Sequence, residues 1–266
     1  MRNSARSAVA LIALLAIAAA LLASCSRQGE IRSSPEAQME IVLIAKSEGE
    51  FWSTVKMGAE AAAKELGVKL TFAAPALETD VRRQIELVNE HLAYGVDAIV
   101  IAASDYEQLA DSVAKADSQG VPVVAIESEI KSDKVRSFIG IDNYQAGRQA
   151  ALKMKELAGG KGRFAILGLM KGARNTEERE RGIIDEWAQD LGMETVKSAS
   201  CGVSASSCTA IVRELLARER SIDGILALNA SSATDAAEVI REMKLAGELK
   251  LVGFDNSPEE LEWLQE

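Results

Sequence analysis

The sequence has few of the residues on which most enzyme active sites depend. It contains one histidine, His91, among 266 residues, and it lacks the GxSxG, HExxH and CxxC motifs. A Ser-His-Asp triad needs a histidine at its centre, and His91 is predicted to lie on the outer flank of a helix. The glycine-rich stretches at 159–162 and 168–172 differ from phosphate and dinucleotide loops in position or in spacing. We therefore expect a protein that binds a ligand, is not an enzyme, and uses no cofactor or metal ion.

Aromatic residues are also scarce, and positive charge is in deficit. Only 4% of the residues are aromatic, so each aromatic side chain near a predicted strand end is a candidate for a specific role. Residues 1–24 carry two of the 30 basic residues and none of the 40 acidic ones, which leaves 28 against 40 and a net charge near −12. This balance argues against nucleic acid and anionic membrane surfaces as partners. The dispersed charge predicts a monomer.

The only long apolar run is at the N-terminus. Two arginines precede an apolar segment over residues 8–23, which ends in Leu-Ala-Ser-Cys at 22–25. A basic segment, an apolar segment and a small-residue cleavage site together predict an export signal over residues 1–24. A transmembrane anchor is the alternative, but the run of about 16 residues is shorter than the ~20 that a spanning helix needs.

The end of this signal resembles a bacterial lipoprotein box. The resemblance implies that Cys25 becomes the lipidated first residue of the mature protein. Residues 25–38 are polar and without a pattern, and they are predicted to form a tether between the lipid and the folded part. The protein is therefore expected to be exported and anchored by lipid to the cell envelope.

Two further cysteines, Cys201 and Cys208, lie close together in the sequence. In an exported protein such a pair can form a disulfide, which would stabilise the fold by about 2–3 kcal/mol because it closes a short loop. The alternative is that both are unpaired, small apolar residues at the edge of a helix. The sequence leaves both alternatives open.

From residue 39 onward, short β-branched runs alternate with longer segments of helical period. This alternation is typical of βαβ units and predicts an α/β fold in which parallel sheets are flanked by helices. The second predicted helix illustrates the pattern, since Val81, Ile85, Val88 and Leu92 form one apolar stripe. The predicted strands are 40–45, 68–73, 97–102, 122–126, 136–141, 163–167, 194–198, 223–228 and 249–254, and the predicted helices are 51–66, 79–94, 105–118, 143–158, 175–191, 205–218, 230–245 and 258–265.

The chain also repeats itself at an interval of about 125 residues. Glu-Leu-Gly-Val-Lys-Leu at 65–70 is echoed by Asp-Leu-Gly-Met-Glu-Thr-Val at 190–196, and Gly-Val-Asp-Ala-Ile-Val-Ile at 95–101 is echoed by Ser-Ile-Asp-Gly-Ile-Leu-Ala at 221–227. Two similar halves predict two Rossmann-like lobes, which we place at 39–141 and 142–266. In open parallel sheets ligands bind at the carboxyl ends of the strands, so we expect the ligand in a cleft between the lobes.

Several short segments carry a resemblance to a known family: Phe51-Trp52, Gly95–Ile99, Gly120–Val124, Ile139–Arg148, Arg179–Gly182 and Val252–Asp255. Together they are similar to the ribose-binding-like periplasmic sugar-binding proteins, the type 1 periplasmic binding proteins. The resemblance implies two lobes that close by a hinge around a sugar and deliver it to the permease of an ABC importer. The alternative is that the same trap is the ligand-sensing component of a membrane sensor or chemoreceptor.

The resemblance also implies which residues bind the ligand. A sugar has apolar ring faces that stack on aromatic rings, and a rim of hydroxyl groups that bond to charged and amide groups. The implied ligand-binding residues are Phe51 and Trp52 for stacking, the acids Glu127 and Asp255, the arginine Arg181 and the amide Asn229, while Asp142 and Asn143 are placed at the hinge.

The assignments of the aromatic pair, the two acids and the arginine each have a structural alternative. Phe51 and Trp52 would then be hydrophobic contacts at the start of a helix, and Glu127 would be a solvated acid in a loop. Arg181 would pair with an acid on its own helix, and Asp255 would cap the helix that begins near residue 258.

The chain departs from the family pattern in two ways. Gly49, Ala102, Ser128 and Val203 stand where ribose-binding relatives have asparagines, an arginine and an aromatic residue, so a related sugar or another small polar metabolite is as well suited as ribose. Family members also continue beyond the position of Glu266, which implies that the C-terminal lobe is incomplete, with fewer hinge crossings and unpaired sheet edges. An enzyme on this scaffold and a non-functional remnant are the remaining alternatives.

Overall fold

The computed structural model of the chain describes residues 38–168, 170–188, 190–201, 205–218 and 221–264. The predicted export signal, the lipidation site Cys25, almost all of the predicted tether and Val203 lie outside these residues. Within them, no helix has the length and apolar character that crossing a membrane would require. Residues from Met39 onward form one unit by their contacts, and they contain two separate parallel sheets.

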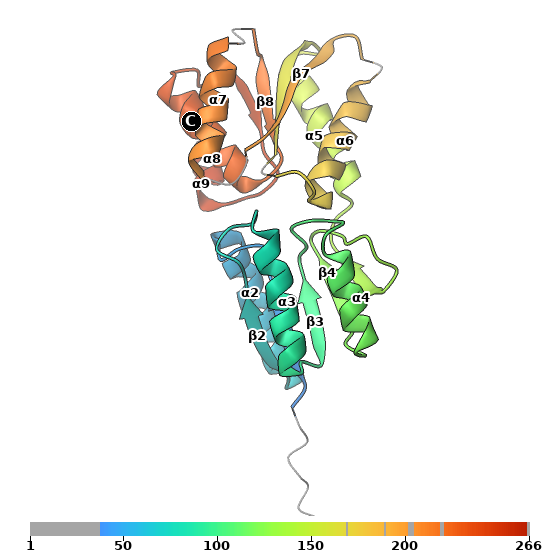
Figure 1. Cartoon of the computed structure of the whole chain (residues 1–266). Coiled ribbons are helices and arrows are strands. Elements are labelled where there is room, and N and C mark those ends of the chain that lie inside the picture. Colours follow the sequence, from blue (N-terminus) through green and yellow to red (C-terminus); the bar gives the residue numbers. More distant parts are fainter. Residues whose placement is uncertain (1–37, 169, 189, 202–204, 219–220, 265–266) are drawn as a thin grey trace, which may run out of the picture. The chain divides into compact units, whose positions relative to one another are not determined.

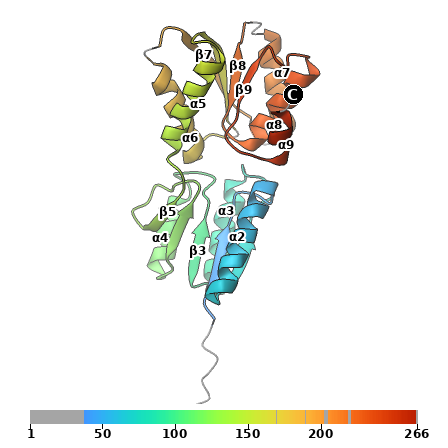
Figure 2. The same ribbon diagram turned by 180° about the vertical axis from the view of Figure 1, so that it is seen from behind.

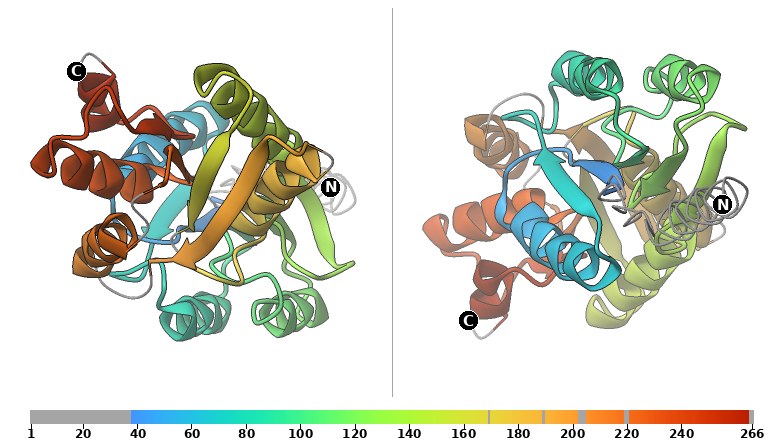
Figure 3. Two further views of the ribbon diagram at one scale, coloured as in Figure 1. Left: turned by 90° about the horizontal axis from the view of Figure 1, so that it is seen from above. Right: turned by 90° about the horizontal axis from the view of Figure 1, so that it is seen from below.

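The first sheet forms the N-terminal lobe and has the strand order β2-β1-β3-β4-β5, with all neighbours parallel. Helix α2 covers one face and helices α3 and α4 cover the other (Figures 1 and 3). Strand residues alternate between these faces, since Leu43 packs with α2 while Val42 and Ile44 pack with α3 and α4. The elements are β1 (Glu40–Ile44), α2 (Glu50–Leu66), β2 (Lys69–Ala73), α3 (Val81–Tyr94), β3 (Ala98–Ile101), α4 (Ala110–Ser118), β4 (Val123–Ile126) and β5 (Val135–Ile139).

The second sheet forms the C-terminal lobe and has the parallel order β7-β6-β8-β9. Helices α5 and α6 pack on one face through residues such as Met154 and Trp187, and α7 and α8 pack on the other through Leu215 and Val239 (Figures 2 and 3). The elements are α5 (Asn143–Leu157), β6 (Gly162–Gly168), α6 (Arg174–Trp187), β7 (Met193–Ser200), α7 (Ala205–Arg218), β8 (Gly224–Ala227), α8 (Ala230–Glu242), β9 (Lys250–Val252) and α9 (Pro258–Trp263).

The predicted α/β architecture with two parallel sheets is confirmed, and the internal echo has a structural counterpart. The second sheet has the order β7-β6-β8-β9, which corresponds strand for strand to the order β2-β1-β3-β4 in the first sheet. The helix predicted at 105–118 is wrong at its start, because α4 begins at Ala110. The Asp105 carboxylate accepts hydrogen bonds from the backbone N–H groups of Glu107 and Gln108, and these bonds favour a turn over a helix. The helix predicted at 175–191 ends earlier, at Trp187.

Cys201 and Cys208 are joined by a disulfide between the end of β7 and helix α7. Both residues are buried, and the backbone N–H of Cys201 donates to the carbonyl of Gly168 at the end of β6. Of the two alternatives that the sequence left open, the structure has the bonded pair. The disulfide therefore connects the start of α7 to the carboxyl edge of the second sheet.

Candidate functional site

The carboxyl ends of the strands of both sheets line a cavity of about 520 Å³. Lys46 follows β1, Glu127 follows β4, Asn229 follows β8 and Asp255 follows β9. A second cavity of about 540 Å³ shares part of this wall, including Phe51 and Asp255. This is the edge at which parallel α/β sheets bind ligands, and residues from both lobes reach it.

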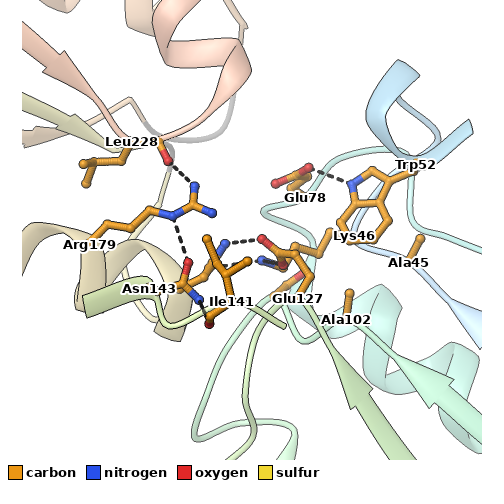
Figure 4. Close-up of polar contacts among 12 residues, drawn as sticks. Ala45, Lys46, Trp52, Glu78, Ala102, Glu127, Ile141, Asn143, Arg179 and Leu228 are labelled. Atoms are coloured by element: carbon orange, nitrogen blue, oxygen red, sulfur yellow. Dashed lines mark hydrogen bonds and ion pairs between the residues drawn. The ribbon is translucent and has the colours of Figure 1, made fainter. Parts of the chain in front are cut away.

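Lys46 and Glu127 lie next to each other at the cavity (Figure 4), and with Asn175 they form a polar cluster that joins the two lobes. The Lys46 ammonium lies 2.6 Å from a Glu127 carboxylate oxygen and donates to the Asn175 side-chain oxygen at 3.2 Å. The Asn175 amide nitrogen donates to the other Glu127 oxygen. Lys46 is only 3% exposed, and a charge this deeply buried needs a partner such as Glu127.

The backbone at Glu127 reinforces this arrangement. Glu127 has a φ of +62°, a left-handed conformation that residues other than glycine seldom adopt. Its N–H donates to the carbonyl of Ile139 at the end of β5. The acid predicted to bind the ligand therefore lies at the cavity, but both of its carboxylate oxygens already contact the protein.

Arg179 is the arginine that lines the cavity. Its Nε donates to the Asn143 side-chain oxygen at 2.9 Å and its Nη1 donates to the Leu228 carbonyl at 2.7 Å (Figure 4). Its guanidinium lies over the Phe254 ring at 4.7 Å. Burial lowers the pKa of Arg179 below its ordinary value, and the charges of Asp255 and Glu127 oppose that shift. These contacts hold the Arg179 guanidinium in one position at the cavity wall.

Close packing of α5 against α6 holds Arg179 in this position. A Cβ atom on Gly147 of α5 would fall within 3 Å of the Arg179 backbone carbonyl, and a Cβ on Gly182 of α6 would meet the backbone of Tyr144 equally closely. Only glycine allows the two helix backbones to approach this far. The pair of glycines thus sets where α6, and with it the arginine, lies relative to α5.

The structure corrects the prediction that Arg181 faces the ligand. Arg181 is exposed, contacts Glu178, and lies over the Tyr144 ring at 4.7 Å, outside the cavity wall. Residues two positions apart on a helix point to nearly opposite sides, so Arg179 and Arg181 cannot both face the cleft. Arg179 takes the place that was assigned to Arg181.

The predicted aromatic pair lies at the cavity, but its two members differ. Phe51 is 47% exposed and lines both cavities. Trp52 is 2% exposed, packs among Leu43 and Ala102, and donates its indole N–H to Glu78 at 2.9 Å. Phe51 is therefore the ring that a ligand can stack on, while Trp52 forms the wall behind it.

Asn229 and Asp255 lie together on the C-terminal side of the cavity. Asn229 caps α8, since its side-chain oxygen accepts from the Ser232 N–H. Asp255 accepts from the N–H of Ala230 at 2.7 Å, in the first turn of α8, where a negative charge is favourable. The alternative that Asp255 caps the following helix is not what the structure has, because Ser257 caps α9.

The residues predicted at the hinge lie at the connection between the sheets. Asp142 caps α5 by accepting the N–H of Gln145 at 3.0 Å, and Asn143 is buried and accepts the bond from Arg179. Their role in a hinge motion stays a prediction. The buried bond from Asn143 to Arg179 nevertheless links the start of α5 to the cavity wall.

Among the charged and amide side chains of the cavity wall, sequence reasoning missed four: Lys46, Glu78, Asn175 and Arg179. Lys46 carried a signal, because it is a charged residue directly after the apolar strand β1. Asn175 and Glu78 are ordinary polar residues in loops or first helical turns, where such residues are common for other reasons. Among the described residues, no group of three or more histidine, cysteine or acidic side chains is arranged to hold a metal ion.

Comparison with known proteins gives a consistent result. The sequence profile of the periplasmic binding protein domain family matches residues 41–266. A D-ribose/D-allose-binding protein of Pseudomonas aeruginosa is 28% identical over 253 residues, which cover 90% of this chain and 79% of that protein. A ribose import binding protein of Bacillus subtilis is also 28% identical, over 79% of this chain and 67% of its own length.

Solved structures agree with the sequence comparison. A carbohydrate transporter solute-binding protein of Agrobacterium radiobacter, in complex with D-arabinose, superimposes with a TM-score of 0.82 and 30% identity, over 86% of this chain and 80% of the other. An ABC transporter solute-binding protein of Agrobacterium vitis with bound D-fucose gives a TM-score of 0.82 at 28% identity, over 85% and 80% of the two chains. The family match spans nearly all of the described residues, and the chain belongs to the periplasmic binding protein domain family.

Proposed function

We propose that this protein is a solute-binding protein that captures a sugar or a similar small polar ligand between its two lobes and delivers it to an ABC importer. The observation that carries the proposal is the cavity at the strand ends, where charged, amide and aromatic side chains from both lobes meet. Such a mixture suits a ligand with apolar ring faces and a rim of hydroxyl groups. No bond is made or broken in this function.

Each wall of the cavity offers a different kind of contact. Phe51 supplies an exposed ring for stacking, and Arg179 supplies a fixed guanidinium that can donate to hydroxyl oxygens. Asp255 supplies a carboxylate that can accept from hydroxyl groups, and Asn229 supplies an amide. Phe51 belongs to the N-terminal lobe and the other three to the C-terminal lobe, so a ligand that contacts both sides would favour the closed arrangement.

Relatives with similar identity to this chain carry names for different ligands. They include proteins named for D-ribose and D-allose, for D-apiose and for xylitol. The ligand proposed here is therefore a monosaccharide or polyol, and the proposal includes both pentoses and hexoses. Delivery to an importer follows the role of these relatives, and we further propose export of the chain, a lipid anchor at Cys25, and action as a monomer.

A thermal-shift screen of residues 26–266 against pentoses, hexoses, polyols, nucleosides and amino acids tests the proposal. A ligand that binds only the folded state raises its stability by RT ln(1 + [L]/Kd), about 2.7 kcal/mol at a hundredfold excess over Kd. We expect a clear rise for at least one sugar or polyol and its loss in the Asp255→Ala variant. Asp133→Ala, which changes an exposed acid outside the cavity, is the matched control.

A cooperative transition without any response to sugars would contradict the sugar assignment. A response to an amino acid or nucleoside alone would replace it with another ligand class. A response that Asp255→Ala leaves intact would move the site away from the cavity.

A further inference from the structure

One segment of the C-terminal lobe is packed against the N-terminal lobe. Residues Met170–Asn175 connect β6 to α6 and enter the first turn of that helix. Met170 nevertheless packs against the buried core on the α3 and α4 face of the first sheet. We refer to Met170–Asn175 as the clasp segment.

The backbone of the clasp segment is bonded to the loop after β3. The N–H of Tyr106 donates to the carbonyl of Gly172 at 2.7 Å. Gly172 has a φ of +91°, and a Cβ atom there would fall within 3 Å of the Asp105 carboxylate. Asp105 is itself fixed, because it accepts from the backbone of Glu107 and Gln108. The two lobes therefore come into backbone contact here, at a point where a β-carbon would have to displace the Asp105 carboxylate.

Two side chains of the clasp segment extend this contact. The Arg174 guanidinium lies over the Tyr106 ring at 5.1 Å and lies 3.7 Å from a Glu129 carboxylate oxygen. Arginine is suited to such a site because its flat guanidinium stacks and bonds at the same time. Asn175 completes the segment by bonding to both members of the buried Lys46–Glu127 pair. The last residue of the segment thus holds two side chains that line the cavity.

We propose that Met170–Asn175 is an interlobe clasp that positions Lys46 and Glu127 at the cavity and sets how closely the lobes approach. All of its contacts join protein atoms to protein atoms, so they hold the two lobes in this arrangement independently of a ligand. Because apparent affinity scales with the fraction of molecules in the binding-competent arrangement, loosening the clasp weakens ligand binding, both by lowering that fraction and by releasing Lys46 and Glu127 from their positions at the cavity. The expected effect on ligand affinity rests on the proposed function, whereas the expected effect on the distance between the lobes does not depend on it.

The Gly172→Ala variant tests the clasp, and the chain offers a matched control. Gly172 and Gly247 both have a positive φ, of +91° and +80°, so alanine is strained at either position. A Cβ on Gly247 meets no atom within 4 Å, whereas a Cβ on Gly172 meets the Asp105 carboxylate. In the Asp105→Ala, Gly172→Ala double variant the nearest remaining Asp105 atom would be its Cβ at 3.8 Å, an ordinary contact.

The readouts are the radius of gyration from small-angle X-ray scattering without ligand, the melting temperature, and the Kd for the sugar found in the thermal-shift screen. We expect Gly172→Ala to increase the radius of gyration and to raise Kd several-fold. Gly247→Ala should lower the melting temperature with neither change, and the double variant should return both values toward those of the unchanged protein.

Equal effects of Gly172→Ala and Gly247→Ala on the radius of gyration would overturn the clasp. So would a double variant that stays as expanded as Gly172→Ala. If no sugar binds the unchanged protein, the proposed function fails, while the scattering comparison still decides whether the segment holds the lobes together.

Discussion

Removing the charge of Lys46 tests whether the polar cluster at the cavity is held by the ion pair with Glu127. Lys46→Met keeps a long side chain and leaves the Glu127 carboxylate without its cation. The two charged atoms lie 2.6 Å apart, and the side chains are 4% and 22% exposed. At an effective dielectric constant of about 20 their gross attraction is about 6 kcal/mol. Desolvation of both groups offsets part of this, so we expect the variant to lose about 3 kcal/mol of unfolding free energy.

A double-mutant cycle separates the interaction energy between Lys46 and Glu127 from the effect of each single substitution. Glu127→Gln leaves Lys46 buried without its carboxylate, and the Lys46→Met, Glu127→Gln variant removes both charges. Urea unfolding should show the double variant less destabilised than the sum of the single variants by about 1–3 kcal/mol. If the loss of unfolding free energy in the double variant equals the sum of the two single losses to within about 0.5 kcal/mol, the ion pair does not hold the cluster.

An exposed pair with the same separation is the control for this cycle. Lys131 and Glu107 also have charged atoms 2.6 Å apart, but their side chains are 60% and 70% exposed. Solvent screens such a pair and side-chain entropy opposes it, so the corresponding cycle should show no measurable coupling. Similar coupling in both pairs would mean that burial is not the reason for the strength of the Lys46–Glu127 pair.

Three further predictions follow from the structure. Arg179→Lys should weaken ligand binding by about tenfold or more in isothermal titration, because lysine cannot keep the bonds of the planar guanidinium. The control variant Arg181→Lys should leave Kd within about twofold, because that side chain points away from the cavity. Equal losses of affinity in the two variants would contradict the assignment of Arg179 to the ligand. Replacing Cys201 and Cys208 with serine should lower the unfolding free energy by about 2–3 kcal/mol, and equal urea midpoints would contradict the bond. Burial lowers the pKa of His91, so the folded state binds fewer protons than the unfolded state and stability falls as the pH drops through the ordinary histidine range. His91→Gln should therefore reduce the loss of stability between about pH 7 and pH 5, and an unchanged loss would contradict this.

Most of the fold could be predicted because the apolar pattern is strong. The strands that became β1, β3, β6 and β8 are short apolar runs, and each was predicted to within two residues at either end. Helix boundaries set by a side-chain bond were harder to predict. Helix α4 starts five residues later than its period indicates, because the Asp105 carboxylate bonds to the backbone two and three residues ahead. A single acid within a polar stretch gives no periodic signal.

The candidate site was predicted less completely, for a geometric reason. Phe51, Glu127, Asn229 and Asp255, which the sequence predicted as ligand residues, line the cavity, and the last three directly follow the ends of strands. The choice of Arg181 depended instead on the rotation of α6 about its axis. That rotation is fixed by the glycine contacts between α5 and α6, which a single sequence does not reveal.

Stability and recognition depend on different parts of this molecule. The residues that bury the sheets, such as Ile44 and Leu226, point into the two faces and fix the architecture whatever the ligand is. Polar residues of the cavity such as Asn229 and Asp255 lie beyond the strand ends, outside those faces. Lys46 and Trp52 are among the exceptions, because both line the cavity and are as buried as the core, and Lys46 depends on Glu127 and Asn175 for its partners. A substitution at Lys46 should therefore affect folding and binding together, whereas a substitution at Phe51, which is half exposed, should affect binding alone.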